Sequence, residues 1–381
     1  MKIAKFGDIA ELIQDRIAPK EDNTGNYIGL ENLPSESLLI TTWQSDVIPD
    51  SDKFLFKKGD VLFARRRAYQ KKVGVAPFDG IISTDGMVFR PKPNIYGSLL
   101  PFIVKSDYFM NYAINNSAGT MSPRVKWKDL QNCEIKIPEN ELQKKYSDLL
   151  WHLENTIILL NERLTILDQL VKSRFIEMFG DIKTNSKGWK CHKLGELGSF
   201  KTGGTPSSKH EEYYQGTIPF ISTPALGPNY IDDGAAKYHI SKEAIENCAT
   251  TLIPAGSLII GTRINVGQSS INKISMCTNQ DIVSMMDIDK KYDLLFLKHC
   301  LNQYIPYLDS QKKGATIKGI TVELLKSVMI PEPPIDEQKQ YVDFVEQVDK
   351  SKFELQKHLD DTKRLQKALI NQAFDPKSVQ N

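Results

Sequence analysis

The chain has 381 residues, of which 40% are hydrophobic and 25% charged, and its formal net charge is +2. These proportions are typical of a globular protein with two or three domains, and they exclude a disordered tail. Apolar runs reach only about four residues and the amino terminus has no apolar signal region, so we expect a cytoplasmic protein without membrane segments.

The even distribution of charge excludes nucleic-acid binding through a global excess of cations. Residues 1–180 carry 24 Lys and Arg against 23 Asp and Glu, and residues 181–381 carry 25 against 24. A DNA-binding face must therefore come from local clustering. The cysteines lie far apart without a CxxC pair, which argues against disulfides and structural zinc. We expect buried free thiols at Cys133, Cys191, Cys248, Cys277 and Cys300.

The first globular region, residues 1–137, contains the densest basic segment. Strand-like runs at 61–64 and 87–90 are bounded by turn formers, and the first precedes five cations in eight residues. Arginine can bond guanine edges, and lysine can neutralise phosphates. Against the alternative of a solvated basic loop, we predict DNA contacts from Arg65, Arg66, Arg67, Tyr69, Gln70, Lys71 and Lys72.

Two patterns near the end of this region have simpler alternatives. Arg124, Lys126 and Lys128 are candidate phosphate contacts, or else members of an ordinary charged strand. Glu134-Ile135-Lys136 has the Glu-x-Lys form of nuclease sites. Because no suitably spaced Pro-Asp precedes it, a charge pair on an edge strand is the simpler explanation.

A long helix is predicted over residues 142–179, within a segment assigned to 138–180. Its apolar residues alternate between spacings of four and three, which is the pattern of a coiled-coil seam. About 40 residues without Pro or Gly make a helix of about 60 Å, too long for one small domain. The seam positions are Tyr146, Leu150, Leu153, Ile157, Leu160, Leu164, Leu167 and Val171.

The second globular region, residues 181–331, offers three groups of candidates. Residues 201–209 include two glycines that let the backbone approach a ligand, although a tight structural turn is an equal alternative and the P-loop spacing fails. A second group follows the strand-like run 257–260. The third group consists of three lysines, whose side chains face either DNA phosphates or only water. The candidates are Lys201, Thr202, Gly203, Gly204, Thr205 and Ser207, then Arg263, Asn265 and Gln268, then Lys312, Lys313 and Lys318.

A second helix of the same kind is predicted at 332–376, before a tail at 377–381. Its seam positions are Tyr341, Val345, Val348, Leu355 and Leu359, followed after a register shift by Leu365 and Leu369. Polar residues weaken it at Lys352, Thr362 and Gln366. The first helix leaves the first region and ends at the second, whereas the second helix leaves the second region. If the seams pack together, the helices must therefore be antiparallel.

The two halves repeat with a period of about 195 residues. Gly59 and Arg66 are spaced as Gly256 and Arg263 are, and an apolar helix-like block at 99–113 recurs at 294–307. The expected fold is therefore α+β. Two tandem α/β-mixed globular domains are separated by two long helices that form an antiparallel coiled coil, with a pseudo-twofold repeat. Such a body suits duplex DNA, on which dimeric proteins contact two half-sites.

The whole chain resembles the specificity subunits of type I restriction-modification systems. The most specific motifs lie in the second half and are Lys201-Thr202-Gly203-Gly204-Thr205-Pro206-Ser207, Glu212-Tyr213-Tyr214-Gln215-Gly216-Thr217-Ile218-Pro219-Phe220-Ile221, Gly314-Ala315-Thr316 with Gly319-Ile320, and Ile330-Pro331-Glu332-Pro333-Pro334-Ile335-Asp336-Glu337-Gln338. The first half departs from this pattern. It has no GGTPS-like loop after Phe6-Gly7-Asp8-Ile9, and it lacks the proline pair at Asn140-Glu141-Leu142.

The resemblance implies two target-recognition domains that each read half of a split double-stranded DNA site. It also implies that the two long helices bind two methyltransferase subunits, joined by restriction (translocase) subunits where the system also cuts DNA. Catalysis then belongs to the partners, which bind S-adenosylmethionine, ATP and Mg, and this chain needs no cofactor or metal. The sequence contains no methyltransferase motif, no GxGxxG after a strand and no HExxH. The alternative is a coiled-coil scaffold protein with incidental basic loops.

Overall fold

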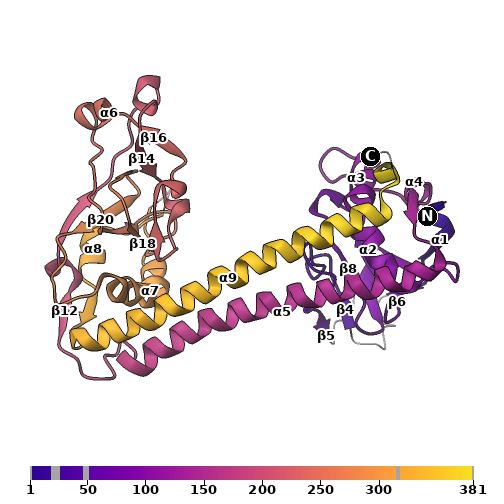
Figure 1. The fold of residues 1–381 in the computed structure, drawn as a ribbon, viewed down its shortest axis with the longest axis horizontal. Helices are drawn as coiled ribbons and strands as arrows, with labels where there is room; N and C mark the ends of the chain where they lie inside the picture. Colours follow the sequence, from indigo (N-terminus) through magenta and orange to yellow (C-terminus); the bar gives the residue numbers. More distant parts are fainter. Residues whose placement is uncertain (1, 19–25, 46–50, 315–317, 380–381) are drawn as a thin grey trace. The chain divides into compact units, whose positions relative to one another are not determined.

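The computed structural model describes residues 2–18, 26–45, 51–314 and 318–379, and the chain divides into two compact units. Unit 1 comprises Met1–Thr165 and Phe353–Asn381, and unit 2 comprises Ile166–Lys352. Each unit combines sheets with helices, so the expected mixed α and β content is confirmed (Figure 1). Ala315 and Thr316 of the resemblance motif, and residues 380–381 of the tail, lie outside the described residues.

Two 40-residue helices, α5 (Asn140–Phe179) and α9 (Ile335–Phe374), each contribute to both units. The helix predicted over 142–179 is confirmed and begins slightly earlier, at Asn140. Each predicted seam position of α5 from Tyr146 to Val171 is buried or half-buried, while most residues between them are exposed. The heptad spacing therefore identified the face of α5 that packs.

Within each unit the two helices pack side by side in antiparallel directions. In unit 1, Leu150 belongs to one apolar cluster with Phe374, and farther along α5 Ile157 packs with Leu359. In unit 2 the Phe175 ring lies 5.4 Å from the ring of Tyr341. In both units the residue numbers of α9 fall as those of α5 rise.

The polar residues that weaken the predicted α9 seam all have partners. Lys352 forms an ion pair with Asp168, with 2.5 Å between Nζ and Oδ1. Gln366 is buried and donates from Nε2 to Glu154 Oε2 at 2.8 Å. Thr362 Oγ1 donates to the carbonyl of its own helix four residues earlier, at 2.7 Å. The packing of α9 therefore tolerates these residues without leaving their side chains unpaired.

In unit 1 the described strands form sheets of order β2-β10-β7-β8, β3-β6-β9-β4-β5 and β1-β11. The strands are β1 (Lys2–Lys5), β2 (Ala10–Ile13), β3 (Arg16–Ile17), β4 (Asn26–Ile28), β5 (Gln44–Ser45), β6 (Lys53–Phe56), β7 (Val61–Ala64), β8 (Val73–Val75), β9 (Gly80–Ser83), β10 (Gly86–Pro91) and β11 (Glu134–Ile137). The helices are α1 (Phe6–Ile9), α2 (Leu100–Lys105), α3 (Asp107–Asn115) and α4 (Trp127–Leu130). The strands predicted at 61–64 and 87–90 are thus confirmed as β7 and part of β10.

In unit 2 the described strands form sheets of order β13-β20-β17-β18-β15, β16-β14-β19 and β12-β21. The strands are β12 (Cys191–Lys193), β13 (Ser199–Thr202), β14 (Ile218–Ile221), β15 (Tyr230–Ile231), β16 (Tyr238–Ile240), β17 (Leu258–Gly261), β18 (Ser269–Asn272), β19 (Cys277–Thr278), β20 (Ile282–Met286) and β21 (Met329–Pro331). The helices are α6 (Lys242–Asn247), α7 (Leu294–Ser310) and α8 (Val322–Lys326).

Each unit closes its sheet-containing region in the same way. In unit 1 the first strand, β1, pairs antiparallel with β11, so that Lys2 lies opposite Ile137 just before α5. In unit 2, β12 pairs with β21, with Cys191 opposite Pro331 just before α9. In each unit a long helix thus begins shortly after the last strand of this pair.

The helix-like block predicted at 99–113 is two helices, α2 and α3, and not one. Ser106 has extended φ and ψ, and its Oγ accepts a hydrogen bond from the Phe109 N–H at 3.2 Å. This N-cap starts a new helix and stops the previous one. Apolar spacing continues across the break because both helices face the same core, which includes Phe102 and Phe109.

All five cysteines are free thiols, as predicted, but burial is confirmed only for Cys133, Cys277 and Cys300, because Cys191 and Cys248 are half-buried. Burial raises the pKa of Cys133 to about 12 and that of Cys277 to about 11, which keeps both thiols protonated. No helix formed by the described residues is long and apolar enough to cross a membrane.

Candidate nucleic-acid interface

The basic segment of unit 1 leaves the end of β7 and turns sharply. A short 3₁₀ turn at Ala68–Gln70 is flanked by Arg67 and Lys71, whose φ values of 56° and 52° are left-handed. These conformations reverse the chain, so the predicted contacts divide by exposure: Arg67, Tyr69, Gln70 and Lys71 are exposed, whereas Arg65, Arg66 and Lys72 are half-buried.

Two of the predicted arginines share one carboxylate. Asp85 accepts from Arg66 Nη1 at 3.2 Å and from Arg124 Nε at 2.9 Å. Arg66 also donates from Nε to Ser122 Oγ at 2.6 Å. One negative charge thus faces two positive charges, which leaves the cluster with a net positive charge available to an anion.

Both predicted lysines of the segment have partners within unit 1. Lys72 donates to the Leu30 carbonyl at 2.8 Å, and Lys71 pairs with Asp107 at 3.1 Å. Asp107 also pairs with Lys367 of α9 at 3.0 Å. Partial burial raises the pKa of Asp107, but hydrogen bonds from Lys367 and Lys71 outweigh burial and lower it overall. Asp107 therefore tethers both the segment and α9.

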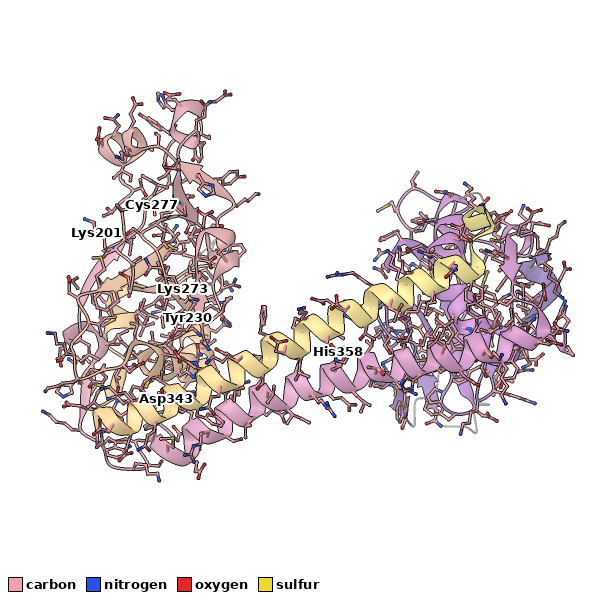
Figure 2. The ribbon with its side chains drawn as sticks, viewed as in Figure 1. Lys201, Tyr230, Lys273, Cys277, Asp343 and His358 are labelled. Carbon is pink, nitrogen blue, oxygen red and sulfur yellow. The ribbon has the colours of Figure 1, made fainter. Side chains whose placement is uncertain are left out.

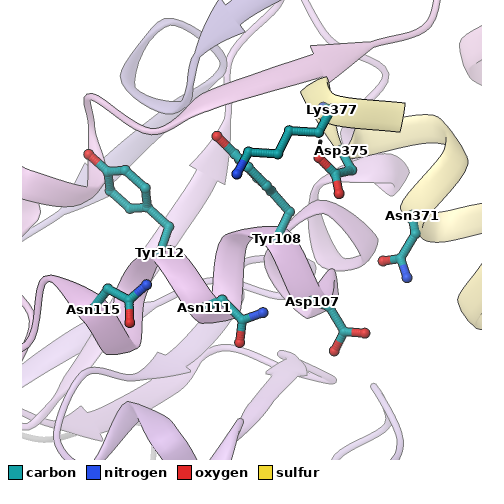
Figure 3. Close-up of a pocket in the computed structure, with 8 residues that line it drawn as sticks. All are labelled: Asp107, Tyr108, Asn111, Tyr112, Asn115, Asn371, Asp375 and Lys377. Atoms are coloured by element: carbon teal, nitrogen blue, oxygen red, sulfur yellow. Dashed lines mark hydrogen bonds between the residues drawn. The ribbon is translucent and has the colours of Figure 1, made fainter. Parts of the chain in front are cut away.

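A hollow of about 370 Å³ opens beside this tether, between α3 and the end of α9 (Figure 3). Its lining is polar and consists of Asp107, Tyr108, Asn111, Tyr112, Asn115, Asn371, Asp375 and Lys377. The Asp107 carboxylate is already paired with two lysines. Apart from Asp107, the hollow therefore presents amides and phenols together with the charged side chains of Asp375 and Lys377.

Arg65 and Lys126 meet at a smaller cavity of about 120 Å³, which Gln14 and Trp127 also line. The Arg65 carbonyl accepts from the Val125 N–H at 3.1 Å, which places residue 126 beside the basic segment. Arg65 Nε is buried without a hydrogen-bond partner among the described residues. The two cations, 61 positions apart in sequence, are thus brought together by the fold.

Unit 2 repeats the construction around Arg263. Arg263 Nη1 pairs with Asp281 Oδ1 at 3.0 Å, and the Thr262 N–H donates to the Asp281 carbonyl at 2.9 Å. In unit 1 the Arg65 N–H donates to the Asp85 carbonyl at 3.2 Å in the same way. In each unit, the arginine that follows the strand therefore pairs with an aspartate at the equivalent position.

The other predicted residues after β17 have different surroundings. Asn265 is exposed with a left-handed φ of 55°, and its Nδ2 donates to the Thr223 carbonyl at 3.3 Å. Gln268 is half-buried and closes the turn, because its carbonyl accepts from the Gly261 N–H at 2.9 Å. Of these two residues, Asn265 is the more accessible to a ligand.

The predicted lysines after α7 lie on a short hairpin that unit 1 also contains. Lys313 and Gly319 exchange backbone hydrogen bonds, as Ala118 and Arg124 do in unit 1. Lys313 and Lys318 are exposed, and half-buried Lys312 forms an ion pair with Asp309. The hairpin thus presents Lys313 and Lys318 on the surface of unit 2.

The glycine-containing stretch of unit 2 divides into buried backbone and exposed side chains. Gly203 and Gly204 are buried, and a Cβ on Gly203 would lie 2.3 Å from the Asn279 carbonyl oxygen. Packing within the protein thus explains the two glycines, in agreement with the alternative of a tight structural turn. The side chains accessible to a ligand are Lys201, labelled in Figure 2, together with Thr202, Thr205 and Ser207.

The nuclease alternative requires Lys136 to be accessible, but this residue is 5% exposed. Its Nζ donates to the Gln372 carbonyl and to Ser378 Oγ, both at 2.9 Å. Lys136 therefore fastens β11 to the end of α9. Among the described residues there is no cluster of three or more His, Cys, Asp or Glu side chains that could hold a metal ion.

Sequence reasoning missed the carboxylates that organise both loops. Asp85 and Asp281 each immediately precede the strand that pairs with β7 or β17. Their separation, about 195 residues, matches the period of the repeat and was the available signal. No pattern in the sequence indicated Ser122, whose hydroxyl accepts a hydrogen bond from Arg66.

Both mixed α/β units thus carry an arginine loop with an equivalent arginine–aspartate ion pair after a strand. The sequence matches the family model described as "Type I restriction modification DNA specificity domain" over residues 1–169 and 186–362. Because this match covers most of the chain, the protein belongs to that family, and its role is DNA target specificity in type I restriction-modification.

Individual relatives agree with this assignment. The chain is 29% identical over 164 residues to the type I restriction enzyme MjaIX specificity subunit of Methanocaldococcus jannaschii, a match that spans 42% of this chain and only 37% of the relative. It is 22% identical over 348 residues to the HindI specificity subunit of Haemophilus influenzae, spanning 71% of this chain and 75% of the relative. The crystal structure of the type I restriction-modification S subunit from M. genitalium shares the fold, with a TM-score of 0.61 at 13% identity over 98% of this chain and 96% of that one.

Proposed function

We propose that this chain is a non-catalytic specificity subunit that selects a bipartite double-stranded DNA target. Residues 1–137 and 181–331 are the two target-recognition domains, one for each half-site. The observation that carries the proposal is the repeated loop, in which the ion pair of Arg66 with Asp85 recurs as Arg263 with Asp281 at the end of the equivalent strand. A target with two half-sites requires two equivalent reading loops.

The side chains around the shared ion pair differ between the domains. Arg65 and Arg67 flank Arg66, whereas Thr262 and Ile264 flank Arg263. Base pairs are distinguished by side chains that reach their edges, and arginine favours guanine. The two domains therefore select different half-sequences, and the first makes more contacts to phosphate or guanine.

In this proposal the segments 138–180 and 332–376 form an antiparallel coiled coil of a pseudo-twofold repeat and bind two methyltransferase subunits. Exposed apolar side chains on α5, such as Leu149 at 44% and Leu159 at 55%, support a protein partner there. Restriction subunits would join through the same complex. S-adenosylmethionine, ATP and Mg are bound by these partners, and the complex works in the cytoplasm, where genomic DNA is accessible.

The test is to express the chain with its methyltransferase partner in a host whose DNA lacks this modification, and to sequence the modified bases. We expect one methylated motif with two separated half-sites, and we expect degeneracy in only one half after Arg263→Ala. Sequence-selective methylation by the partner alone would contradict the proposal. The scaffold alternative predicts instead that Arg65→Ala, Arg66→Ala and Arg67→Ala together leave the methylated motif unchanged while assembly survives.

A further inference from the structure

The loop between α3 and α4 of unit 1 presents an apolar side chain to solvent. Met121 is 92% exposed, the largest exposed fraction among the large hydrophobic residues of the described part of the chain. A single exposed apolar residue is ordinary on a protein surface. Whether Met121 has a function therefore depends on how its loop is held and on what surrounds it.

The loop is a closed hairpin. The Ala118 N–H donates to the Arg124 carbonyl at 3.0 Å, and the Arg124 N–H donates to the Ala118 carbonyl at 2.9 Å. Gly119 has a φ of 120°, a conformation that glycine adopts readily and that permits the tight turn. Met121 lies between these closing residues, at the end of the loop farthest from its base.

The residues that follow Met121 are fastened to the basic segment. Arg66 Nε donates to Ser122 Oγ at 2.6 Å, and the Arg67 N–H donates to the Pro123 carbonyl at 2.8 Å. These bonds fix the backbone next to Met121 while its side chain makes no burying contact. Hydrogen bonds to the basic segment thus keep Met121 in its exposed position.

The surroundings of this apolar tip are cationic. Arg66 and Arg124 share the single carboxylate of Asp85, and exposed Arg67 lies on the adjoining backbone. An apolar side chain surrounded by arginines is complementary to a polyanion with an apolar interior. Duplex DNA has this combination, because its phosphates are outside and its stacked bases inside.

We propose that Met121 is a wedge that inserts between neighbouring base pairs of duplex DNA while the surrounding arginines bind the flanking phosphates. This inference rests on the proposed DNA-binding role of residues 1–137. Apolar wedges partly unstack a base step and kink the duplex, and the unbranched methionine side chain adapts to such a gap. Flexible pyrimidine–purine steps are easiest to open, so Met121 selects for such a step without a base-edge hydrogen bond.

The test uses the complex of this chain with its methyltransferase partner and a duplex that carries the methylated motif found by sequencing. Fluorescent base analogues, 2-aminopurine or pyrrolo-cytosine, replace one base at a time through both half-sites, because their emission rises when they unstack. Methyltransferase subunits flip their target bases out of the duplex, so analogues at and beside the methylated positions brighten independently of Met121 and serve only as positive controls. At the remaining positions we expect one step to brighten with the wild type and with Met121→Leu. We expect the signal to disappear with Met121→Ala and with the equally long but polar Met121→Gln, and affinity to fall roughly tenfold with Met121→Ala. Ile3→Gln, which changes another exposed apolar residue of unit 1, should change neither quantity.

The outcomes separate this inference from the function on which it rests. If the wild type binds the duplex but no analogue away from the methylated positions brightens, or if Met121→Ala leaves that signal intact, the wedge is refuted while sequence-specific binding stands. If Met121→Ala weakens assembly with the methyltransferase but not unstacking, Met121 belongs to a protein interface and the wedge is again refuted. If the wild-type complex binds no duplex, both the wedge and the proposed function fail.

Discussion

Gln143 and Gln338 make the same two hydrogen bonds in their respective units. Gln143 accepts from the Tyr96 N–H at 2.7 Å and donates to the Pro138 carbonyl at 3.1 Å. Gln338 accepts from the Asp293 N–H at 2.8 Å and donates to the Pro333 carbonyl at 2.9 Å. Both are buried in the first turns of a long helix, so each fastens that helix to the segment that enters α2 or α7. The repeat therefore extends to individual hydrogen bonds.

We expect Gln143→Leu to destabilise unit 1 by about 1–3 kcal/mol, because the change leaves a buried backbone N–H and carbonyl unpaired. The midpoint of urea denaturation, followed by circular dichroism, measures the loss. Gln338→Leu should act equally on unit 2. Gln347→Leu on the exposed face of α9 is the matched control, and an equal loss in this control would show that the buried bonds are unimportant.

Glu154 joins three elements of unit 1 and is fully buried. It accepts from the Leu38 N–H at 2.6 Å, from Lys105 Nζ at 3.0 Å and from Gln366 Nε2 at 2.8 Å. We expect Glu154→Ala to cost about 3–5 kcal/mol of stability, because it leaves the mostly buried Lys105 ammonium with the Glu36 carbonyl at 2.9 Å but without a counter-charge. Glu154→Ala combined with Lys105→Met should recover part of the loss in the same denaturation assay. A double variant no more stable than Glu154→Ala would contradict this account.

The seam of α5 and the α9 seam as far as Leu359 could be predicted from sequence because they depend on local spacing. The register shift predicted for the end of α9 is wrong, because Leu365 is 51% exposed whereas the polar residues Thr362 and Gln366 are buried. Residues at heptad positions share one helix face whatever the rest of the chain does. The block at 99–113 was predicted only as an apolar helix-like stretch, and this pattern did not show that Ser106 ends one helix and caps the next. Helix propensity and the spacing of apolar residues carry little information about such a break between helices.

The arginine loops after β7 and β17 could be located from sequence, but their internal contacts could not be predicted. The position of Arg66 after a strand was predictable from turn formers and β-rich residues. Its pairing with Asp85 depends on the register of β7 and β10, in which Ala64 lies opposite Gly86. Register is set by the whole sheet and by which face is buried, so a single sequence did not show that one carboxylate neutralises part of the arginine cluster.

Arg67 and Asp85 should have opposite effects on DNA affinity. Arg67 is exposed, so we expect Arg67→Ala to reduce the slope of log affinity against log salt concentration by about 0.9, the loss of one phosphate contact. Asp85→Asn frees Arg66 and Arg124 from their shared partner, so it should raise the affinity for non-specific duplex DNA. The ratio of target affinity to non-specific affinity should then decrease. Fluorescence anisotropy across a salt series measures both. An unchanged slope in Arg67→Ala would exclude this residue from phosphate binding.

A buried hydrogen-bond chain in unit 2 should make stability depend on pH. Asn229 Nδ2 donates to Asp349 at 2.7 Å, so its Oδ1 accepts from His299 Nε2, and His299 Nδ1 accepts from the Tyr341 hydroxyl at 2.5 Å. His299 is therefore neutral. Burial, reinforced by the charges of Lys298 and Lys352, lowers the pKa of His299 to about 3 from its ordinary value of 6.5.

Because the folded pKa lies below the unfolded value, the unfolded chain takes up a proton first as the pH falls. The contribution of His299 to stability is complete above pH 6.5 and declines toward pH 3, by about 2 kcal/mol between pH 7.5 and pH 5. We expect His299→Gln, which cannot titrate, to remove that part of the pH dependence of urea denaturation. The matched change His358→Gln, at an exposed histidine, should leave it in place. Equal pH profiles for the wild type and His299→Gln would mean that His299 is not held neutral in the folded protein.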